Sequence, residues 1–211
     1  MKVLVICAHP DDEVIGCGGT IAKHTKDGDE VYVCIVSEGV SGQYDHEGMI
    51  EERRKHANEV QKLLNIKKYF FFDFPDVKLD TIPQLEINKT IESVIQQVKP
   101  DIVYTHDGND LNSDHQIVSN STLVACRPLR AKFIKKILFY EIFGSTKQFN
   151  PNYYVDLTDD FDKKLTALSK YETEVDAQTR SLETIRKLAA FRGCEINTSL
   201  AEAFRIFREI K

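Results

Sequence analysis

The sequence predicts an α/β fold of the doubly wound, Rossmann-like kind, with a mainly parallel sheet, helices on both faces and a C-terminal helical cap. Short apolar runs rich in β-branched residues alternate with longer segments of helical apolar spacing over about residues 1–143. The chain has 211 residues, of which 42% are hydrophobic, which is enough for one sizeable core. We therefore expect a single domain over 1–211, with the cap at about 144–211.

The first part of the alternation begins with residues 3–8, VLVICA. A continuous apolar run of this length is typical of a strand that is buried on both faces of a parallel sheet. The next expected elements are a short helix at 18–28, a strand at 31–37, a helix at 49–66 and a strand at 67–72.

The second part repeats the pattern, and Pro100 marks the break between a helix and the strand after it. The expected elements are a helix at 82–98, a strand at 101–106, a helix at 114–127 and a strand at 135–143. After residue 143 the alternation stops. We expect an irregular loop, then helices near 160–172, 180–192 and 200–209 that pack on the sheet edge as a cap.

Charge and cysteine content exclude several classes of partner. Twenty-eight Lys and Arg residues against 33 Asp and Glu residues give a net charge of −5 with no dense basic block, which argues against nucleic acid and acidic lipid as partners. The run at 3–8 is too short for a membrane span or a signal peptide. Five scattered cysteines without a CxxC pair fit a reducing, cytoplasmic environment, and a homo-oligomer remains possible.

Polar side chains follow two of the expected strands at the points where the strands end. The strand at 3–8 ends at His9 and the strand at 101–106 ends at His106, and the loops that follow read HPDDE and HDGNDLNSDH. If the two strands are neighbours, both loops meet in one crevice at the carboxyl edge of the sheet, where ligands bind in such folds. Three adjacent carboxylates repel one another, so this edge is expected to bind a cation.

Imidazole and carboxylate ligands together suit zinc, which needs about three protein ligands at a catalytic site. His9 and Asp12 can supply two ligands, and His115 or His106 the third. Asp11 is then placed to act as general base. Two other interpretations stay open. The polar residues after the strands serve only as turn residues, with Ser113 or Asp114 as the cap of the following helix, or the GCGG stretch holds a phosphate in a non-catalytic sugar- or nucleotide-binding module.

The stretch AHPDDEVIGCGGTIA at 8–22 closely resembles the N-terminal signature of the PIG-L/LmbE-like zinc-dependent N-deacetylases. That signature is a hydrophobic strand followed by (A/G)HPDDE and GGT. The similarity continues in an R-x-x-H element that begins at Arg53, a KPDIVYTH strand, an N-x-D-H element at 112–115 and an R-S-x-E-x-I stretch that begins at Arg180. It covers essentially the whole chain.

The resemblance implies a role for each matching residue. The implied roles are zinc ligands for His9, Asp12 and His115, general base for Asp11, the substrate-binding edge for Arg53, and support of the ligand loop for Glu13. We also expect Asp114 to orient His115 or a neighbouring ligand. We add Asp110 and Arg180 as candidate substrate-binding residues, with Arg180 facing an anionic part of the substrate.

One position departs from the family pattern. Several members have a histidine three residues before the last zinc ligand, where it stabilises the oxyanion and protonates the leaving amine, and this chain has Asn112 there. An amide can donate a hydrogen bond to an oxyanion but cannot deliver a proton. Either Asp11 carries the proton to the amine or His106 takes the place of the acid, and we favour Asp11.

The sequence thus predicts a zinc-dependent hydrolase that removes the acetyl group from an N-acetylated amino sugar or sugar conjugate. The alternatives are hydrolysis of another small N-acyl amide and the non-catalytic binding module. The expected partner is a small amino-sugar substrate.

Overall fold

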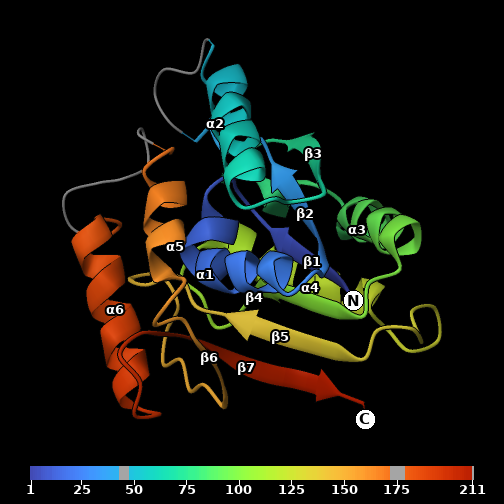
Figure 1. The fold of residues 1–211 in the computed structure, drawn as a ribbon. Helices are drawn as coiled ribbons and strands as arrows, with labels where there is room; N and C mark the ends of the chain where they lie inside the picture. The colour runs from blue at the N-terminus through green and yellow to red at the C-terminus, as the bar shows by residue number, and fades with distance from the viewer. Residues whose placement is uncertain (43–47, 172–178, 211) are drawn as a thin grey trace.

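A computed structural model describes residues 1–42, 48–171 and 179–210, and within them the chain forms one seven-stranded sheet in the order β3-β2-β1-β4-β5-β7-β6 (Figure 1). The strands are β1 (Lys2–Cys7), β2 (Glu30–Ser37), β3 (Lys68–Phe74), β4 (Ile102–His106), β5 (Lys136–Tyr140), β6 (Tyr153–Asp156) and β7 (Ala201–Glu209). β1 to β5 are parallel, whereas β7 is antiparallel to both β5 and β6. The predicted doubly wound, mainly parallel fold is confirmed.

Helices cover both faces of the sheet (Figure 1). They are α1 (Asp12–Lys26), α2 (Met49–Leu63), α3 (Gln84–Val98), α4 (Ser113–Ala125), α5 (Phe161–Leu168) and α6 (Leu182–Cys194), with a 3-10 turn at Leu79–Thr81. The side chains of β1 alternate between two cores. Val3 and Val5 pack in the core beneath α1, α2 and α5, and Leu4 and Ile6 pack in the core beneath α3 and α4.

The strand order places the two histidine-ended strands side by side. β1 pairs in parallel with β4, and the register runs from Val3 opposite Ile102 to Ile6 opposite Thr105. The loops after His9 and His106 therefore leave the sheet at the same edge, as the sequence predicts.

The prediction of a helix near 200–209 is wrong, because this segment forms strand β7. It lies between β5 and β6 and pairs with both. Phe204 and Ile206 face the core beneath α1 and α5, which is the every-second-residue pattern of a strand. The segment is rich in Ala, Glu and Arg, which favour helices, so burial against the rest of the fold outweighs its local helix propensity. The C-terminal segment thus contributes two strands to the sheet edge, β6 and β7, as well as the helices α5 and α6.

Helix α1 begins six residues before the predicted helix at 18–28. Its first turn is closed by the carbonyl of Asp11, which accepts hydrogen bonds from the amides of Val14 and Ile15, both at 2.9 Å. Asp11 itself has φ 122°, a conformation that residues other than glycine rarely adopt. The acidic residues of the HPDDE loop therefore lie on the tight turn and first turn of α1.

The GCGG stretch does not form a phosphate-binding loop, because it lies inside α1. A Cβ atom at Gly16 would lie 2.4 Å from the Tyr140 ring, and one at Gly19 would lie 2.3 Å from Leu157. Glycine at these positions lets the helix pack closely on its neighbours. The structure therefore removes the support that this stretch gave to the binding-module alternative.

A buried ion pair joins α5 and β7 to the same part of α1. Lys164 Nζ lies 2.6 Å from Glu202 Oε1 and 2.6 Å from the carbonyl oxygen of Ile15. The Glu202 carboxylate accepts hydrogen bonds from the amides of Gly19 and Thr20, at 3.0 and 2.7 Å. The C-terminal segment is thereby fastened to the helix that begins at the HPDDE loop.

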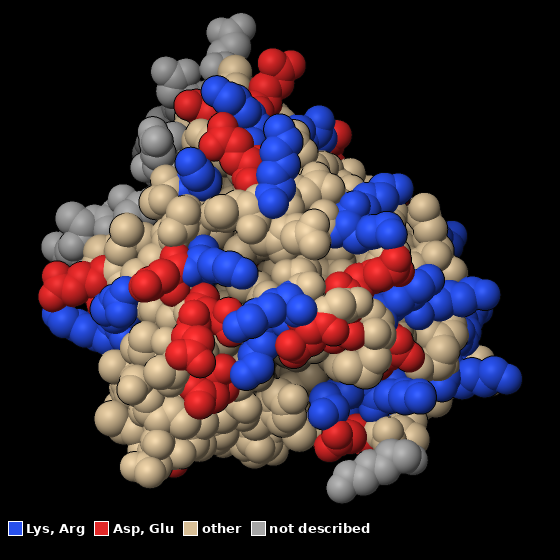
Figure 2. Space-filling model, in the orientation of Figure 1, with Lys and Arg blue, Asp and Glu red and all other residues tan. Residues whose placement is uncertain are grey.

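Charged side chains of both signs alternate over the face of the molecule shown in Figure 2. This mixture agrees with the absence of a dense basic block in the sequence. Within the described residues, every helix is too short or too polar to cross a bilayer.

We predict that Lys164→Met lowers the free energy of unfolding by about 3–5 kcal/mol, because it leaves the Glu202 carboxylate buried without its cation. The matched control is Lys187→Met, which breaks the exposed pair of Lys187 with Glu183 and is expected to cost at most about 0.5 kcal/mol. Denaturant unfolding of the two variants measures the difference. Equal losses would contradict the proposed anchoring role of Lys164.

Candidate metal centre and active-site cleft

The loops at the carboxyl edge of the sheet bring His9, Asp12 and His115 together. One ligand atom from each residue lies within 4.8 Å of the others, and all three residues are buried. Asp12 Oδ2 is 3.3 Å from His9 Nδ1, and Asp12 Oδ1 is 3.5 Å from His115 Nε2. The three residues that the resemblance implies as ligands therefore form a compact group.

Three buried atoms of this group make no hydrogen bond within the described structure. They are Asp12 Oδ1 and both ring nitrogens of His115. A buried carboxylate oxygen and a buried imidazole nitrogen are both costly without a partner, and both are ligands for a divalent cation. The donor set thus fits a metal ion held by His9 Nδ1, Asp12 and His115 Nε2.

The other nitrogen of each imidazole faces a carboxylate. His115 Nδ1 lies 3.2 Å from Asp110 Oδ1, and His9 Nε2 lies 3.3 Å from Asp114 Oδ2 and 3.0 Å from Asp76 Oδ1. Such carboxylates fix the ring orientation and make the free nitrogen a better metal ligand. Asp114 therefore lies where the sequence prediction placed it, beside a ligand, although the ligand is His9.

The electrostatics of the group depend on close contacts between the acids and the imidazoles. Burial alone would lower the pKa of His9, but Asp114, Asp12 and Asp76 outweigh it and hold the pKa well above its usual range. Burial would raise the pKa of Asp12, but His115 and His106 hold it well below its usual range.

Asp11 borders a cleft next to the metal-binding group. The cleft is lined by His9, Asp11, Gly39, Gly42, Arg53, Asp76, Val77, Asn112 and Arg180. The Asp11 side chain is 2% exposed, and Arg180 Nη1 donates a hydrogen bond to its Oδ2 at 3.0 Å. Asp11 is therefore a carboxylate beside the metal-binding group rather than a member of it.

Asn112 and Arg53 line the same cleft. Asn112 is the N-cap of α4, and its side-chain oxygen accepts a hydrogen bond from the amide of Asp114 at 2.8 Å. This bond fixes the Asn112 amide oxygen, so the NH₂ group is the end available to donate. Arg53 reaches the cleft from α2 and is 3% exposed.

Two residues that were predicted to act in catalysis or substrate binding, His106 and Asp110, lie outside the cleft lining. His106 is fully buried, its Nε2 accepts a hydrogen bond from the amide of Ala8 at 3.0 Å, and its ring stacks on His115 at 4.0 Å between centroids. Burial and the neighbouring His115 lower the pKa of His106 to about 4. Its position beneath His115 favours a supporting role over the acid role that we considered.

Asp110 is also buried behind the ligands rather than exposed to substrate. Its carboxylate accepts hydrogen bonds from Ser145 Oγ, from Thr146 Oγ1 at 2.8 Å and from the amide of Asn112 at 2.9 Å. Together with His115 these contacts hold the pKa of Asp110 well below its usual range, although burial would raise it. The geometry points to orientation of His115 instead of the predicted substrate contact.

Glu13 supports the HPDDE turn from inside the core. It accepts hydrogen bonds from the hydroxyls of Tyr171 at 2.5 Å and Tyr69 at 3.1 Å, and from the amide of Asp11 at 3.1 Å. Burial raises the pKa of Glu13 to about 7. Its contacts are those of the loop-supporting residue that the resemblance implies.

Asp76 is a site residue that sequence reasoning missed. It lines the cleft, touches His9 Nε2, and follows β3 at the same edge of the sheet. The signal that identified the loops after His9 and His106, acids directly after a strand, was present here in the residues DFPD. Residues 43–47 lie outside the described part of the chain.

The fold and the site together define an α/β protein with a His/Asp metal-binding group at the carboxyl edge of a parallel sheet. The sequence model of the family described as PIG-L, GlcNAc-PI de-N-acetylase, matches residues 4–126. The chain belongs to this family, which confirms the resemblance identified in the sequence.

Several relatives are similar over most of their length. Diacetylchitobiose deacetylase of Thermococcus kodakarensis is 29% identical and aligns over 97% of this chain and 82% of its own. A probable N-acetyl-α-D-glucosaminyl L-malate deacetylase 2 of Bacillus cereus is 26% identical over 83% of this chain and 84% of its own. The structure of N,N′-diacetylchitobiose deacetylase from Pyrococcus horikoshii, with 28% identity, superposes with a TM-score of 0.84 over 98% of this chain and 84% of that one.

We predict that Asp110→Asn weakens metal affinity about 10–100-fold, because it weakens the carboxylate contact that orients His115. The control is Asp107→Asn, which alters a buried carboxylate of the same loop that pairs with Arg205 away from the metal-binding group. Competition with a chelator measures the affinity. A raised KM with unchanged metal affinity would instead support the substrate-binding role predicted from the sequence.

The metal-free protein is expected to lose stability as the pH rises above about 6.5. His9 has a raised folded pKa, so its stabilising contribution is complete below its unfolded pKa and disappears as pH rises through the folded value. A bound metal takes the place of the proton on His9, so the metal-loaded protein should not lose stability over this pH range. Unfolding free energies with and without chelator between pH 6 and 9 test this, and His9→Gln should flatten the chelated profile.

Proposed function

We propose that this protein is a zinc-dependent deacetylase that hydrolyses the acetamide group of an N-acetylated amino sugar or sugar conjugate. The main support is the metal-binding group of His9, Asp12 and His115 with a separate carboxylate, Asp11, at the edge of one cleft. A metal site beside an independent general base is the arrangement that amide hydrolysis needs.

Zinc is the cation that a set of two imidazoles and one carboxylate suits best, and three protein ligands leave room for further ligands. When bound, it supplies Lewis-acid chemistry that polarises the acetyl carbonyl and acidifies water. His9, Asp12 and His115 hold it, and Asp110, Asp114 and Asp76 keep the two imidazoles in their metal-binding orientation.

Asp11 moves the protons of the reaction. Its carboxylate takes a proton from the attacking water as the new C–O bond forms at the acetyl carbon. When the C–N bond breaks, Asp11 returns that proton to the nitrogen, so the free amine leaves together with acetic acid, which ionises to acetate. The hydrogen bond from Arg180 Nη1 to Asp11 Oδ2, at 3.0 Å, holds this carboxylate at the edge of the cleft.

Asn112 takes the place that histidine has in several family members, and its NH₂ group is proposed to donate to the oxygen that becomes negative in the tetrahedral intermediate. Its oxygen is already bonded to the Asp114 amide, which pre-orients the donor. Because an amide cannot transfer a proton, the acid step falls to Asp11 as well.

Amino-sugar substrates are proposed on two grounds. The similar proteins named above are deacetylases of diacetylchitobiose and of N-acetylglucosaminyl malate. The cleft also carries Arg53 and Asp76, a donor and an acceptor suited to sugar hydroxyls. We further propose a cytoplasmic location, because four of the five cysteines are buried free thiols.

Zinc content and acetate release test the proposal on one set of variants. Asp11→Asn should retain zinc and lose about 10²–10⁴-fold in kcat, because it removes only the proton acceptor. Asp12→Asn should lose zinc, because it removes a ligand. The substrates are N-acetylglucosamine, diacetylchitobiose and nucleotide- and lipid-linked N-acetylglucosamine, each assayed with the wild-type protein at full zinc occupancy.

Loss of zinc in Asp11→Asn with retention in Asp12→Asn would exchange the two roles. No effect of either change on zinc or turnover would mean that HPDDE is only a turn. Acetate release from simple N-acyl amides but from none of the sugars would favour the alternative hydrolase function.

A further inference from the structure

Among the residues that the structure describes, Val77 is the only aliphatic side chain in the lining of the cleft. The other lining residues are glycines and residues with charged, amide or imidazole side chains. Val77 is 56% exposed, so it contributes little to the core. An exposed apolar side chain in a polar cleft is a candidate contact for an apolar part of the ligand.

The backbone of Val77 adopts a conformation that disfavours valine. Its φ is 55°, in the left-handed region, where a β-branched residue is an outlier and glycine is favoured. The conformation has a structural cause, because the Val77 amide donates to Asp114 Oδ2 at 2.8 Å. Glycine would make the same bond without the strain. The bond therefore explains the backbone at this position but not the isopropyl group, and such strain is typical of ligand-binding sites.

The loop after β2 leaves space for this isopropyl group. Gly42 faces it, and a Cβ atom at Gly42 would lie 2.6 Å from Val77 Cγ2. The Gly42 amide also donates to Oδ2 of the preceding residue, Asp76, at 3.3 Å. The side chain of Val77 is thus held beside Gly42 as part of the cleft wall, and the rest of its surface is open.

Val77 lies on the side of His9 that faces away from the metal-binding group. His9 Nδ1 is 3.3 Å from Asp12 Oδ2, whereas His9 Nε2 is 3.3 Å from Asp114 Oδ2, the atom that accepts the Val77 amide. The amide that is hydrolysed has to lie near the metal ligands and Asp11. The Val77 side chain therefore meets a part of the substrate beyond that amide.

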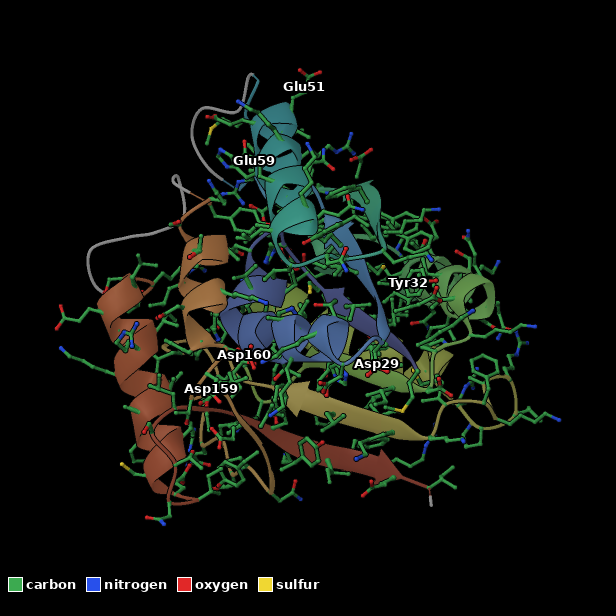
Figure 3. All side chains as sticks on the ribbon, viewed as in Figure 1. Asp29, Tyr32, Glu51, Glu59, Asp159 and Asp160 are labelled. Carbon is green, nitrogen blue, oxygen red and sulfur yellow. The ribbon has the colours of Figure 1, made fainter. Side chains whose placement is uncertain are left out.

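The polar groups on this side of the cleft are a donor and an acceptor. Asp76 directly precedes Val77, and Arg53 reaches the cleft from α2, on which it lies between Glu51 and Glu59, both labelled in Figure 3. A pyranose ring has hydroxyl groups around its edge and C–H groups on its faces. One aliphatic side chain beside a donor and an acceptor matches this distribution.

We propose that Val77 packs against the C–H face of a pyranose ring and is a specificity-determining residue, which favours a cyclic amino sugar over an open-chain N-acyl amide. The inference rests on the function proposed above and narrows its substrate class to a ring. The contact is made by substrate rather than by the fold, which accounts for a strained, exposed valine where glycine would suit the backbone better.

The probes are N-acetylglucosamine and its open-chain alditol, N-acetylglucosaminitol, assayed for acetate release by the zinc-loaded full chain. The wild-type protein should prefer the cyclic sugar, and Val77→Ala should lower kcat/KM for it about 10-fold, mainly through KM, because an apolar contact is lost. The alditol has no ring face, so its kcat/KM should change less than about 2-fold. Leu85→Ala is the control, because Leu85 is an exposed aliphatic residue of α3 outside the cleft lining.

Val77→Gly tests the strain separately. It should lose the same preference for the ring, and its unfolding temperature should not fall below that of the wild-type protein, because relief of strain offsets the added freedom of the unfolded chain. A lower unfolding temperature would mean that Val77 is a packing residue.

The Val77 inference and the proposed function fail in different ways. An unchanged preference in Val77→Ala, an equal loss for both probes, or a wild-type protein without preference for the ring would overturn the Val77 contact and leave the deacetylase function standing. If the zinc-loaded wild-type protein releases acetate from neither probe nor from any other sugar named above, the proposed function is rejected, and the Val77 contact with it.

Discussion

The arrangement of the molecule depends on the burial of several carboxylates around two imidazoles at one edge of the sheet. Asp12, Asp110 and Asp114 are each at most 1% exposed. Like charges this close are strongly unfavourable at low dielectric unless positive charge lies among them. Protons on the imidazoles or a bound cation can supply it. The buried acids and imidazoles at this edge therefore fit a bound cation.

The same constraint explains why the loops around the site are well anchored. Asp114 accepts hydrogen bonds from the amides of Val77 at 2.8 Å and Leu79 at 3.2 Å, which ties the loop after β3 to the start of α4. Glu13 ties the HPDDE turn to two tyrosines. Asp114 thereby holds Val77, and Glu13 holds Asp11, and both held residues line the cleft. The geometry of the metal-binding side chains and the shape of the cleft are therefore linked.

The sequence was sufficient for the parts of the structure that follow from local pattern. The apolar run at 3–8 had to be a doubly buried strand, and parallel pairing of β1 with β4 then brought His9 near His115. Individual side-chain contacts between the other distant segments were not predicted. Asp76 and Asp110 owe their places to the β3 and β4 loops, and Arg180 meets Asp11 across 169 positions. β7 was misread because its burial pattern exists only once β5 and β6 flank it.

The position of β7 has a consequence for the order in which the protein can fold. β6 precedes β7 in the chain but pairs with it, and β7 separates β6 from β5. During synthesis, the parallel strands β1 to β5 can assemble first, and β6 stays unpaired until β7 has been made. Glu202 lies on β7, so its ion pair with Lys164 can form only after β7 has been made. A nascent chain released before residue 201 would therefore leave the edge of β5 unpaired and would lack the Glu202 carboxylate that pairs with Lys164. Quality-control proteases act on chains in such incompletely folded states.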